Sequence, residues 1–170
     1  MINRSLFTLR CSLFLAFCLF FTGCYTFKGF SIDPAVQTFY ISNFVNKASL
    51  APASLGQDFS ERFRNRVRDE ARLKFNENSP DVEFSGTISD YRITAEAPLP
   101  GEGSSINVVT MVVNVEHNNS KNEKANYKRD FSFQRRFDAT TSLSSIQEDL
   151  NKQMINEIIT NIFNDTFNNW

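Results

Sequence analysis

The chain has 170 residues, of which 41% are hydrophobic and 22% charged, a composition that supports one packed domain rather than a disordered chain. Its 18 basic and 19 acidic residues give a formal net charge of −1, so it lacks the basic excess typical of nucleic-acid-binding proteins. The single histidine excludes a multi-histidine metal site, and we expect neither a metal nor a cofactor.

The first residues have the pattern of a signal peptide for secretion. Arg4 and Arg10 flank an apolar run at residues 11–21, which is far shorter than the roughly 20 residues of a membrane-spanning helix. The sequence FTGC follows at residues 21–24 and resembles the lipobox of bacterial lipoproteins, in which a peptidase cuts before the cysteine and its thiol is acylated. The pattern therefore predicts an acylated Cys24 at the start of the mature chain.

We divide the chain into a lipoprotein signal peptide at residues 1–23 and a single domain at residues 24–170. The other two cysteines would leave with the signal peptide, so no disulfide can stabilise the domain. The alternative is an ordinary secretory signal with a chance cysteine, but a lone thiol in an oxidising compartment is a liability unless it is used. Lipoproteins that are retained in the inner membrane usually have an aspartate directly after the acylated cysteine, whereas this chain has Tyr25. This difference predicts a lipid anchor in the outer membrane, on its periplasmic side.

The chain from residue 36 onward is predicted to begin with a strand and a helix. Residues 36–45 are rich in β-branched and aromatic types, which favours a strand. The helix is predicted to end near residues 76–80, because a residue before proline avoids the helical conformation. Its apolar stripe and a row of arginines on its far side, where we expect a solvated face, recur every fourth residue. The stripe comprises Leu55, Phe59, Phe63, Val67 and Ala71, and the arginines are Arg64, Arg68 and Arg72.

Three further strands and a second helix complete the prediction. Apolar and polar residues alternate from Val82, and the alternation changes phase at Tyr91, which predicts a β-bulge near Ser89–Asp90. The remaining elements are a loop at 98–105, a strand at 106–116, a hairpin connection at 118–126, a strand at 131–137 and a long helix with a capping box that begins at Ser144 or Ser145.

The order β-α-β-β-β-α predicts an α+β fold, a two-layer sandwich of a four-stranded mixed sheet with two helices on one face. The first two strands should run parallel through a right-handed crossover, and the last three should form an antiparallel meander. Aromatic and polar residues alternate along the fourth strand, so we expect one largely aromatic and one polar face.

Several segments resemble the LptE family of lipopolysaccharide-assembly lipoproteins. They are residues 24–29, residues 39–46, FSGTISDY at 84–91, and NIFN and FNNW within 161–170. The resemblance spans the mature chain and agrees with the predicted order of elements. It implies a lipoprotein that lies inside the β-barrel of LptD, helps to insert lipopolysaccharide into the outer leaflet, and performs no covalent chemistry.

Basic residues around the fourth strand are candidates for binding the lipopolysaccharide head group, because Arg and Lys form charge-assisted hydrogen bonds with phosphate. The alternative is a solvated hairpin tip, in which Glu123 and Asp130 stand among the basic residues. The candidates are Lys121, Lys124, Lys128, Arg129 and Arg136.

We expect no enzyme. His117 lies at the end of a predicted strand, and Glu116 points to the other side, so no carboxylate is placed to orient the imidazole. Asp138, Glu148 and Asp149 are better explained as acids at a strand end and a helix start, where the helix dipole favours them.

Two functions remain open. One is an LptE-like plug and assembly partner that binds an LptD-like β-barrel and lipopolysaccharide. The other is a different outer-membrane accessory lipoprotein, either an activator of a peptidoglycan synthase or a pilot for another barrel. For the plug, the polar sheet face suits a wet barrel interior. We then expect the loops at 98–105 and 118–126 to point into the barrel, and the end near Cys24 to stay in the membrane outside it.

Overall fold

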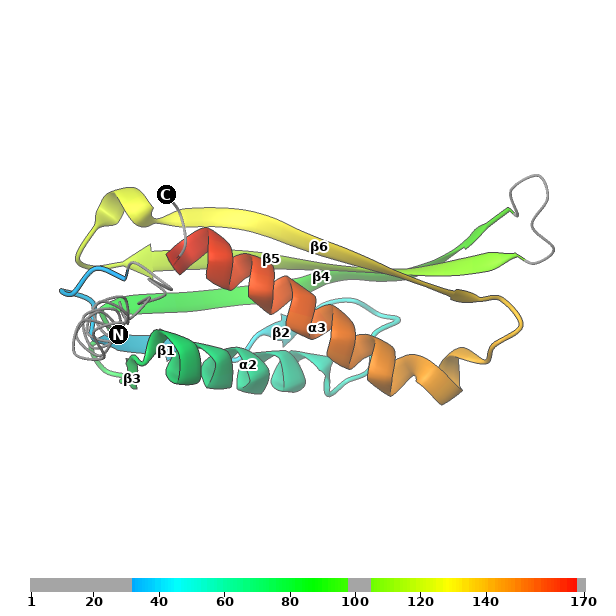
Figure 1. Ribbon diagram of the computed structural model, residues 1–170, viewed down its shortest axis with the longest axis horizontal. Helices are drawn as coiled ribbons and strands as arrows, with labels where there is room; N and C mark the ends of the chain where they lie inside the picture. The colour runs from blue at the N-terminus through cyan, green and yellow to red at the C-terminus, as the bar shows by residue number, and fades with distance from the viewer. Residues whose placement is uncertain (1–31, 98–104, 168–170) are drawn as a thin grey trace, which may run out of the picture.

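The structure, a computed structural model, describes residues 32–97 and 105–167, which form a two-layer α+β fold (Figure 1). The predicted signal peptide at 1–23 and Cys24 lie outside the described residues, as do residues 98–104 of the predicted loop. The strands are β1 (Thr38–Ile41), β2 (Val45–Asn46), β3 (Lys74–Phe75), β4 (Val82–Glu96), β5 (Ile106–Asn119) and β6 (Tyr127–Asp138).

The described strands form one mixed sheet in the order β3-β1-β4-β5-β6, with β2 also paired to β4. As predicted, β1 runs parallel to β4, while β4, β5 and β6 form an antiparallel meander. The predicted β-bulge is confirmed by the register shift between Ile88 and Asp90. The predicted count of four strands is wrong, because the described residues form a sheet of six.

The extra strands arise at the β1 side of the sheet. The predicted strand at 36–45 is two strands, because Ile41 pairs with Phe84 but Val45 pairs with Thr87, so the first strand holds one more residue than its partner. The added residue lets Phe44 turn into the core, where its ring lies over Gly86. The second extra strand, β3, is a two-residue edge strand paired with β1.

The first helix, α2 (Leu55–Arg66), continues into a π-helical turn, η1 (Val67–Ala71). Every residue of its predicted apolar stripe is buried. The predicted end near residues 76–80 is wrong, because Arg72 adopts the left-handed conformation with φ 55° and directs the chain into β3. The last helix is α3 (Leu143–Phe167), and the short 3₁₀ turn η2 (Glu123–Ala125) joins β5 to β6.

The predicted capping box of the last helix does not form. Since α3 already begins at Leu143, Ser144 and Ser145 lie within its first turn. The backbone carbonyl of Ser142 accepts hydrogen bonds from both the backbone N–H and the hydroxyl of Ser145, at 3.1 and 2.7 Å. Ser142 therefore occupies the place before the helix that the pattern had given to its neighbours.

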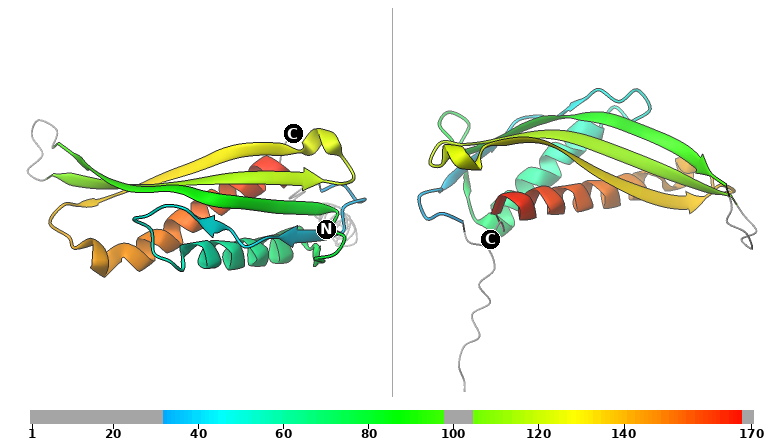
Figure 2. Two further views of the ribbon diagram at one scale, coloured as in Figure 1. Left: turned by 180° about the vertical axis from the view of Figure 1, so that it is seen from behind. Right: turned by 90° about the horizontal axis from the view of Figure 1, so that it is seen from above.

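Both helices cover the same face of the sheet, as predicted, and the described residues leave the other face bare (Figure 2). Phenylalanines from α2, the strands and α3 form the centre of the core, among them Phe59, Phe63, Phe84 and Phe163. Within the described ranges, no helix is long and apolar enough to cross a membrane.

Candidate functional site

The two faces of the sheet differ in chemistry. Along β6, the odd-numbered residues from 127 to 137 face the helices and are largely aromatic, while the even-numbered residues from 128 to 138 are exposed and polar. This confirms the predicted division of the fourth strand. We call the bare side of β4, β5 and β6 the open face.

Ion pairs cross the open face from strand to strand. Glu116 of β5 pairs with Lys128 of β6 at 3.5 Å, and these residues are also register partners. Arg136 of β6 pairs with Glu96 of β4 at 3.3 Å, reaching past the strand that lies between them. Its register partner on that strand is Val108, which is only 4% exposed although it lies on the open face. The charges of the open face are thus largely matched within the sheet.

The structure does not bring the five predicted basic residues together. Lys128 and Arg136 share the open face but stand roughly 27 Å apart along β6. Arg129 points to the helix-covered face, where it donates two hydrogen bonds of 2.7 Å to the carboxylate of Asp165 on α3. Lys121 and Lys124 lie on the connection between β5 and β6. Of the five, Lys124 alone forms no ion pair within the described residues.

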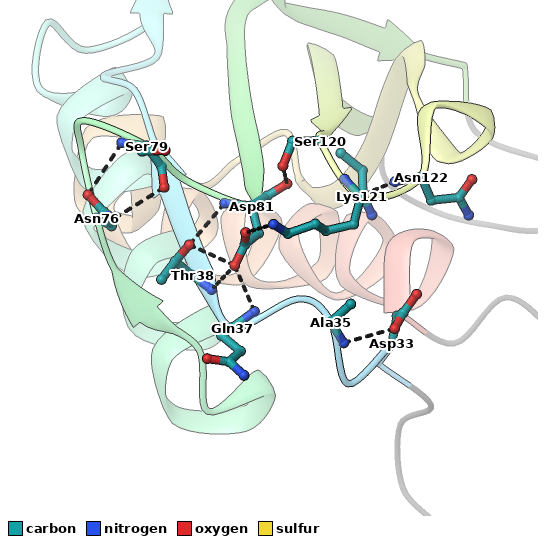
Figure 3. Close-up of polar contacts among 11 residues, drawn as sticks. Asp33, Ala35, Gln37, Thr38, Asn76, Ser79, Asp81, Ser120, Lys121 and Asn122 are labelled. Carbon is teal, nitrogen blue, oxygen red and sulfur yellow. Dashed lines mark hydrogen bonds and ion pairs between the residues drawn. The ribbon is translucent and has the colours of Figure 1, made fainter.

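Lys121 belongs to a polar cluster centred on Asp81 at the start of β4 (Figure 3). The Asp81 Oδ2 atom accepts hydrogen bonds from the backbone N–H groups of Gln37 and Thr38 and from the Thr38 hydroxyl, each at 2.9 Å. The Lys121 ammonium lies 3.0 Å from the other carboxylate oxygen. The Gln37 amide, Lys121 and Thr38 hold the pKa of Asp81 well below its usual range.

The Asp81 cluster joins β1, β4 and the connection between β5 and β6. Ser120 also donates its backbone N–H to the backbone carbonyl of Asp81, at 2.8 Å. The connection at 118–126 is thereby held at the end of the sheet where the described chain begins, while β4 ends at Glu96 and β5 begins at Ile106 at the opposite end. Asp81 was not singled out from the sequence, since one acid before a strand has no distinctive spacing.

His117 is buried in an aromatic stack. Its ring lies 4.6 Å from that of Phe84 and 5.2 Å from that of Tyr127, and only 1% of the residue is exposed. Burial lowers its pKa to about 4, opposed by a hydrogen bond to the backbone oxygen of Glu83. Within the part of the chain that the structure describes, its Nδ1 atom has no hydrogen-bond partner. As predicted, Glu116 lies on the opposite face of the sheet, where it pairs with Lys128.

The arginine row of the first helix is not the uniformly solvated face that its spacing predicts. The Arg64 guanidinium donates hydrogen bonds to the backbone carbonyl of Ile41 and to the side chain of Asn43, which fastens α2 to the end of β1. Arg68 contacts Asn65 and Asp69 of its own helix. Arg72 lies beyond the helix altogether.

The carboxylates considered for catalysis are separated. Asp138 accepts hydrogen bonds from the backbone N–H and hydroxyl of Thr140, which lower its pKa. Asp149 accepts a hydrogen bond from Gln153 on its own helix. Glu148 lies in a hollow of about 470 Å³ between α2 and α3, with Asp58, Arg62 and Lys152 also in its lining. This hollow contains equal numbers of acidic and basic side chains.

The arrangement defines a two-layer α+β domain with a dry, helix-covered sheet face and a polar open face. The family described as "LptE: Lipopolysaccharide-assembly" matches residues 36–166. The chain belongs to this family, and it is therefore a lipopolysaccharide-assembly lipoprotein of the outer membrane.

Solved structures share the fold at low sequence identity. Protein CT253 from Chlamydia trachomatis is 10% identical with a TM-score of 0.53, and the match covers 79% of this chain and 99% of that chain. A minor lipoprotein from Acinetobacter baumannii is 8% identical with a TM-score of 0.50, and the match covers 75% of this chain and 90% of that chain. Among curated proteins, no relative matched this chain. At these identities the structural likeness shows the fold alone.

Proposed function

We propose that this protein is the plug and assembly partner of an LptD-like β-barrel and helps to insert lipopolysaccharide into the outer leaflet. The observation that carries the proposal is the bare, polar open face on a member of the LptE family. A polar sheet face without a covering layer suits the interior of a large barrel, whose inward side chains are themselves polar. The protein acts by binding, without covalent chemistry.

The proposed anchor is an acylated Cys24 on the periplasmic side of the outer membrane, exposed by cleavage after residue 23, with residues 24–170 as the single mature domain. The geometry changes the expected orientation in the barrel. The connection at 118–126 lies at the end of the sheet where the described chain begins, whereas Glu96 and Ile106 lie at the opposite end, which favours pointing only one of these ends into the barrel. We propose that the end of the sheet near Glu96 and Ile106 leads into the barrel.

The proposed lipopolysaccharide contacts differ in how available they are to bind a phosphate group. They remain Lys121, Lys124, Lys128, Arg129 and Arg136. Lys124 has no ion-pair partner among the described residues, so a phosphate group would displace no acid from it. Lys128 and Arg136 have partially exposed acid partners, and exposed ion pairs contribute only about 0–1 kcal/mol, so a phosphate group can replace either acid at little cost. Arg129 is held by two short hydrogen bonds against α3 and is the least available of the five.

Site-specific photo-cross-linking in cells tests the orientation. A cross-linker at Thr94 or Ser132, both exposed on the open face, should trap the LptD-like barrel. One at Glu61 or Glu157, exposed on the helices, should trap it much less. Equal trapping from both faces would contradict the orientation.

Co-purification from detergent-solubilised membranes tests the partner itself. We expect the barrel protein to be recovered with the full-length chain. Recovery of a peptidoglycan synthase, or of an unrelated barrel, would instead favour the alternative accessory lipoprotein. In a lipopolysaccharide-binding assay with the same preparation, Lys124→Ala should weaken binding more than Lys152→Ala, which removes another exposed lysine, on α3.

A further inference from the structure

The segment that leaves the first helix exposes an aromatic side chain between basic ones. Arg72, Lys74 and Phe75 are exposed, while Leu73 between them is buried. The left-handed backbone of Arg72 produces this arrangement, because it ends η1 and turns the chain outward into β3. We call the three exposed residues the 72–75 patch.

Phe75 is 52% exposed although it is held in place by other rings. Its ring lies 5.8 Å from the ring of Phe39 in an edge-on arrangement and 5.8 Å from that of Tyr40. Phe75 is thus a positioned aromatic side chain with half of its surface left in water. Such a residue contributes binding energy when a partly apolar surface covers it.

The second feature of the patch is its positive charge. Among the described residues, neither Arg72 nor Lys74 forms an ion pair. Both line a hollow of about 290 Å³ together with Ile32 and Asp33, the first described residues of the chain. Asp33 is the one acid in the lining, and its carboxylate accepts a hydrogen bond from the backbone N–H of Ala35 at 2.9 Å (Figure 3). The hollow therefore has an excess of positive charge.

The hollow lies close to the proposed anchor along the chain. Ile32 follows Cys24 by eight positions, which a fully extended backbone spans in at most about 28 Å. The intervening residues include three aromatic residues and Lys28 but no acid. A linker of so few residues raises the local concentration of the group that it carries to the millimolar range. A weak affinity between the 72–75 patch and the anchoring leaflet is then sufficient for contact.

We propose that the 72–75 patch rests on anionic phospholipid head groups of the leaflet that holds the acylated cysteine. This inference depends on the acylation of Cys24 in the proposed function. Each Lys or Arg near an anionic membrane surface strengthens binding to it about fivefold, and an exposed Phe can bury its ring at the boundary between head groups and acyl chains. Free phosphate would engage the two cations but would gain nothing from Phe75. The contact would fix which end of the sheet stays at the membrane.

The experiment uses the full-length acylated protein in vesicles without a barrel partner. A photoreactive phenylalanine derivative replaces Phe75, and in a second variant Leu50. Leu50 is 63% exposed and lies before α2, so the helix separates it from the patch by about 25 Å. In phosphatidylethanolamine vesicles containing phosphatidylglycerol, position 75 should label lipid at least about fivefold more than position 50. Replacing phosphatidylglycerol by phosphatidylcholine should remove most of that excess.

Charge reversal separates the patch from general attraction to the membrane. Arg72→Glu with Lys74→Glu should reduce lipid labelling from position 75 at least about fivefold. Lys47→Glu with Lys152→Glu makes the same change in net charge at exposed residues outside the patch and should leave labelling unchanged. Three results would overturn the inference: equal labelling from positions 75 and 50, an equal loss of labelling in both double variants, or labelling that does not depend on phosphatidylglycerol.

The acyl group is measured separately by mass spectrometry of the same protein. A chain without an acyl group would refute the anchor in the proposed function, and this inference with it. An acylated chain whose position 75 does not label lipid would overturn the inference and leave the proposed function standing. Circular dichroism checks that each variant keeps the helix content of the parent protein.

Discussion

The covered face and the open face belong to the same three strands but hold their residues in different ways. On the covered face, Phe84 and Phe131 are buried among other apolar side chains, so shape fixes their positions. On the open face, Lys128 is held by Glu116 of the neighbouring strand β5, and Arg136 by Glu96 of β4, one strand further away. Close packing tolerates little change, whereas an exposed ion pair can be exchanged for another partner. The covered face therefore stabilises the fold, and the open face is free to serve binding.

The largest expected effect comes from removing a ring on the covered side. Phe63 of α2 is fully buried, and its ring contacts those of Phe44, Phe59 and Phe84. Phe63→Ala should leave a cavity and lower the free energy of unfolding by about 3–5 kcal/mol. The measurement is denaturant unfolding of the full-length chain in mild detergent.

Ser132→Ala is the matched change on the open face. Because Ser132 is exposed, its truncation should alter the free energy of unfolding by no more than about 0.5 kcal/mol. Similar costs for the two truncations would show that the contrast between the faces is wrong.

The sequence was a good guide to the covered face. Hydrophobic side chains at a regular period reveal which side of an element is buried, so the stripe from Leu55 to Ala71 and the alternation along β6 were correctly placed. The β-bulge near Ser89 was equally visible, because an inserted residue reverses the phase of the pattern. Strands β2 and β3 were missed, since two residues are too few to show a period.

The sequence was a poor guide to the candidate site. Lys128 pairs with Glu116, which the register of β5 and β6 places opposite it. The register of two strands cannot be predicted from the residues around Lys128 alone. Arg129 was grouped with its exposed neighbour although it points to the other face and binds Asp165. Arg72 was predicted to lie on the first helix with Arg64 and Arg68, yet its backbone adopts the left-handed conformation that ends the helix. Only tertiary structure supplies these partners.

The second prediction concerns pH and His117. In the unfolded chain its pKa returns to about 6.5, whereas burial lowers it to about 4 in the folded protein. Between these values the unfolded state binds the extra proton, so stability should fall as pH drops from 6.5 to 4, by about 3 kcal/mol in total. Unfolding measured at closely spaced pH values gives this slope.

His117→Phe provides the control, since a phenyl ring fits a stack of Phe84 and Tyr127 and has no titrating nitrogen. In the variant, the free energy of unfolding should no longer fall between pH 6.5 and 4. Asp81 and Asp138 stabilise the fold mainly at pH above their ordinary pKa of 3.8. The stability that they contribute should therefore be lost at lower pH than that of His117, and this loss should persist in the variant. An unchanged slope in His117→Phe would assign the pH dependence to other groups.

The third prediction tests how tightly the covered face is packed at Gly86. A Cβ atom at this position of β4 would lie 2.2 Å from the backbone oxygen of Asn114 and 2.5 Å from the Phe44 ring. Gly86→Ala should therefore cost about 1–3 kcal/mol through strain, although it adds a single methyl group. Unfolding of the full-length variant measures the loss. A neutral or stabilising result would mean that both the Phe44 ring and the β5 backbone at Asn114 can shift to admit the methyl group.

The smallest expected effect lies on the open face, in the Glu116–Lys128 pair. Both side chains are substantially exposed, at 44% and 67%, so water screens their attraction. A double-mutant cycle with Glu116→Gln and Lys128→Gln should give a coupling energy of about 0.2–1 kcal/mol that shrinks as salt is added. A coupling above about 2 kcal/mol would mean that the open face is locked by its own charges. A small coupling instead means that a phosphate group or a polar barrel wall can replace Glu116 beside Lys128 without disturbing the core.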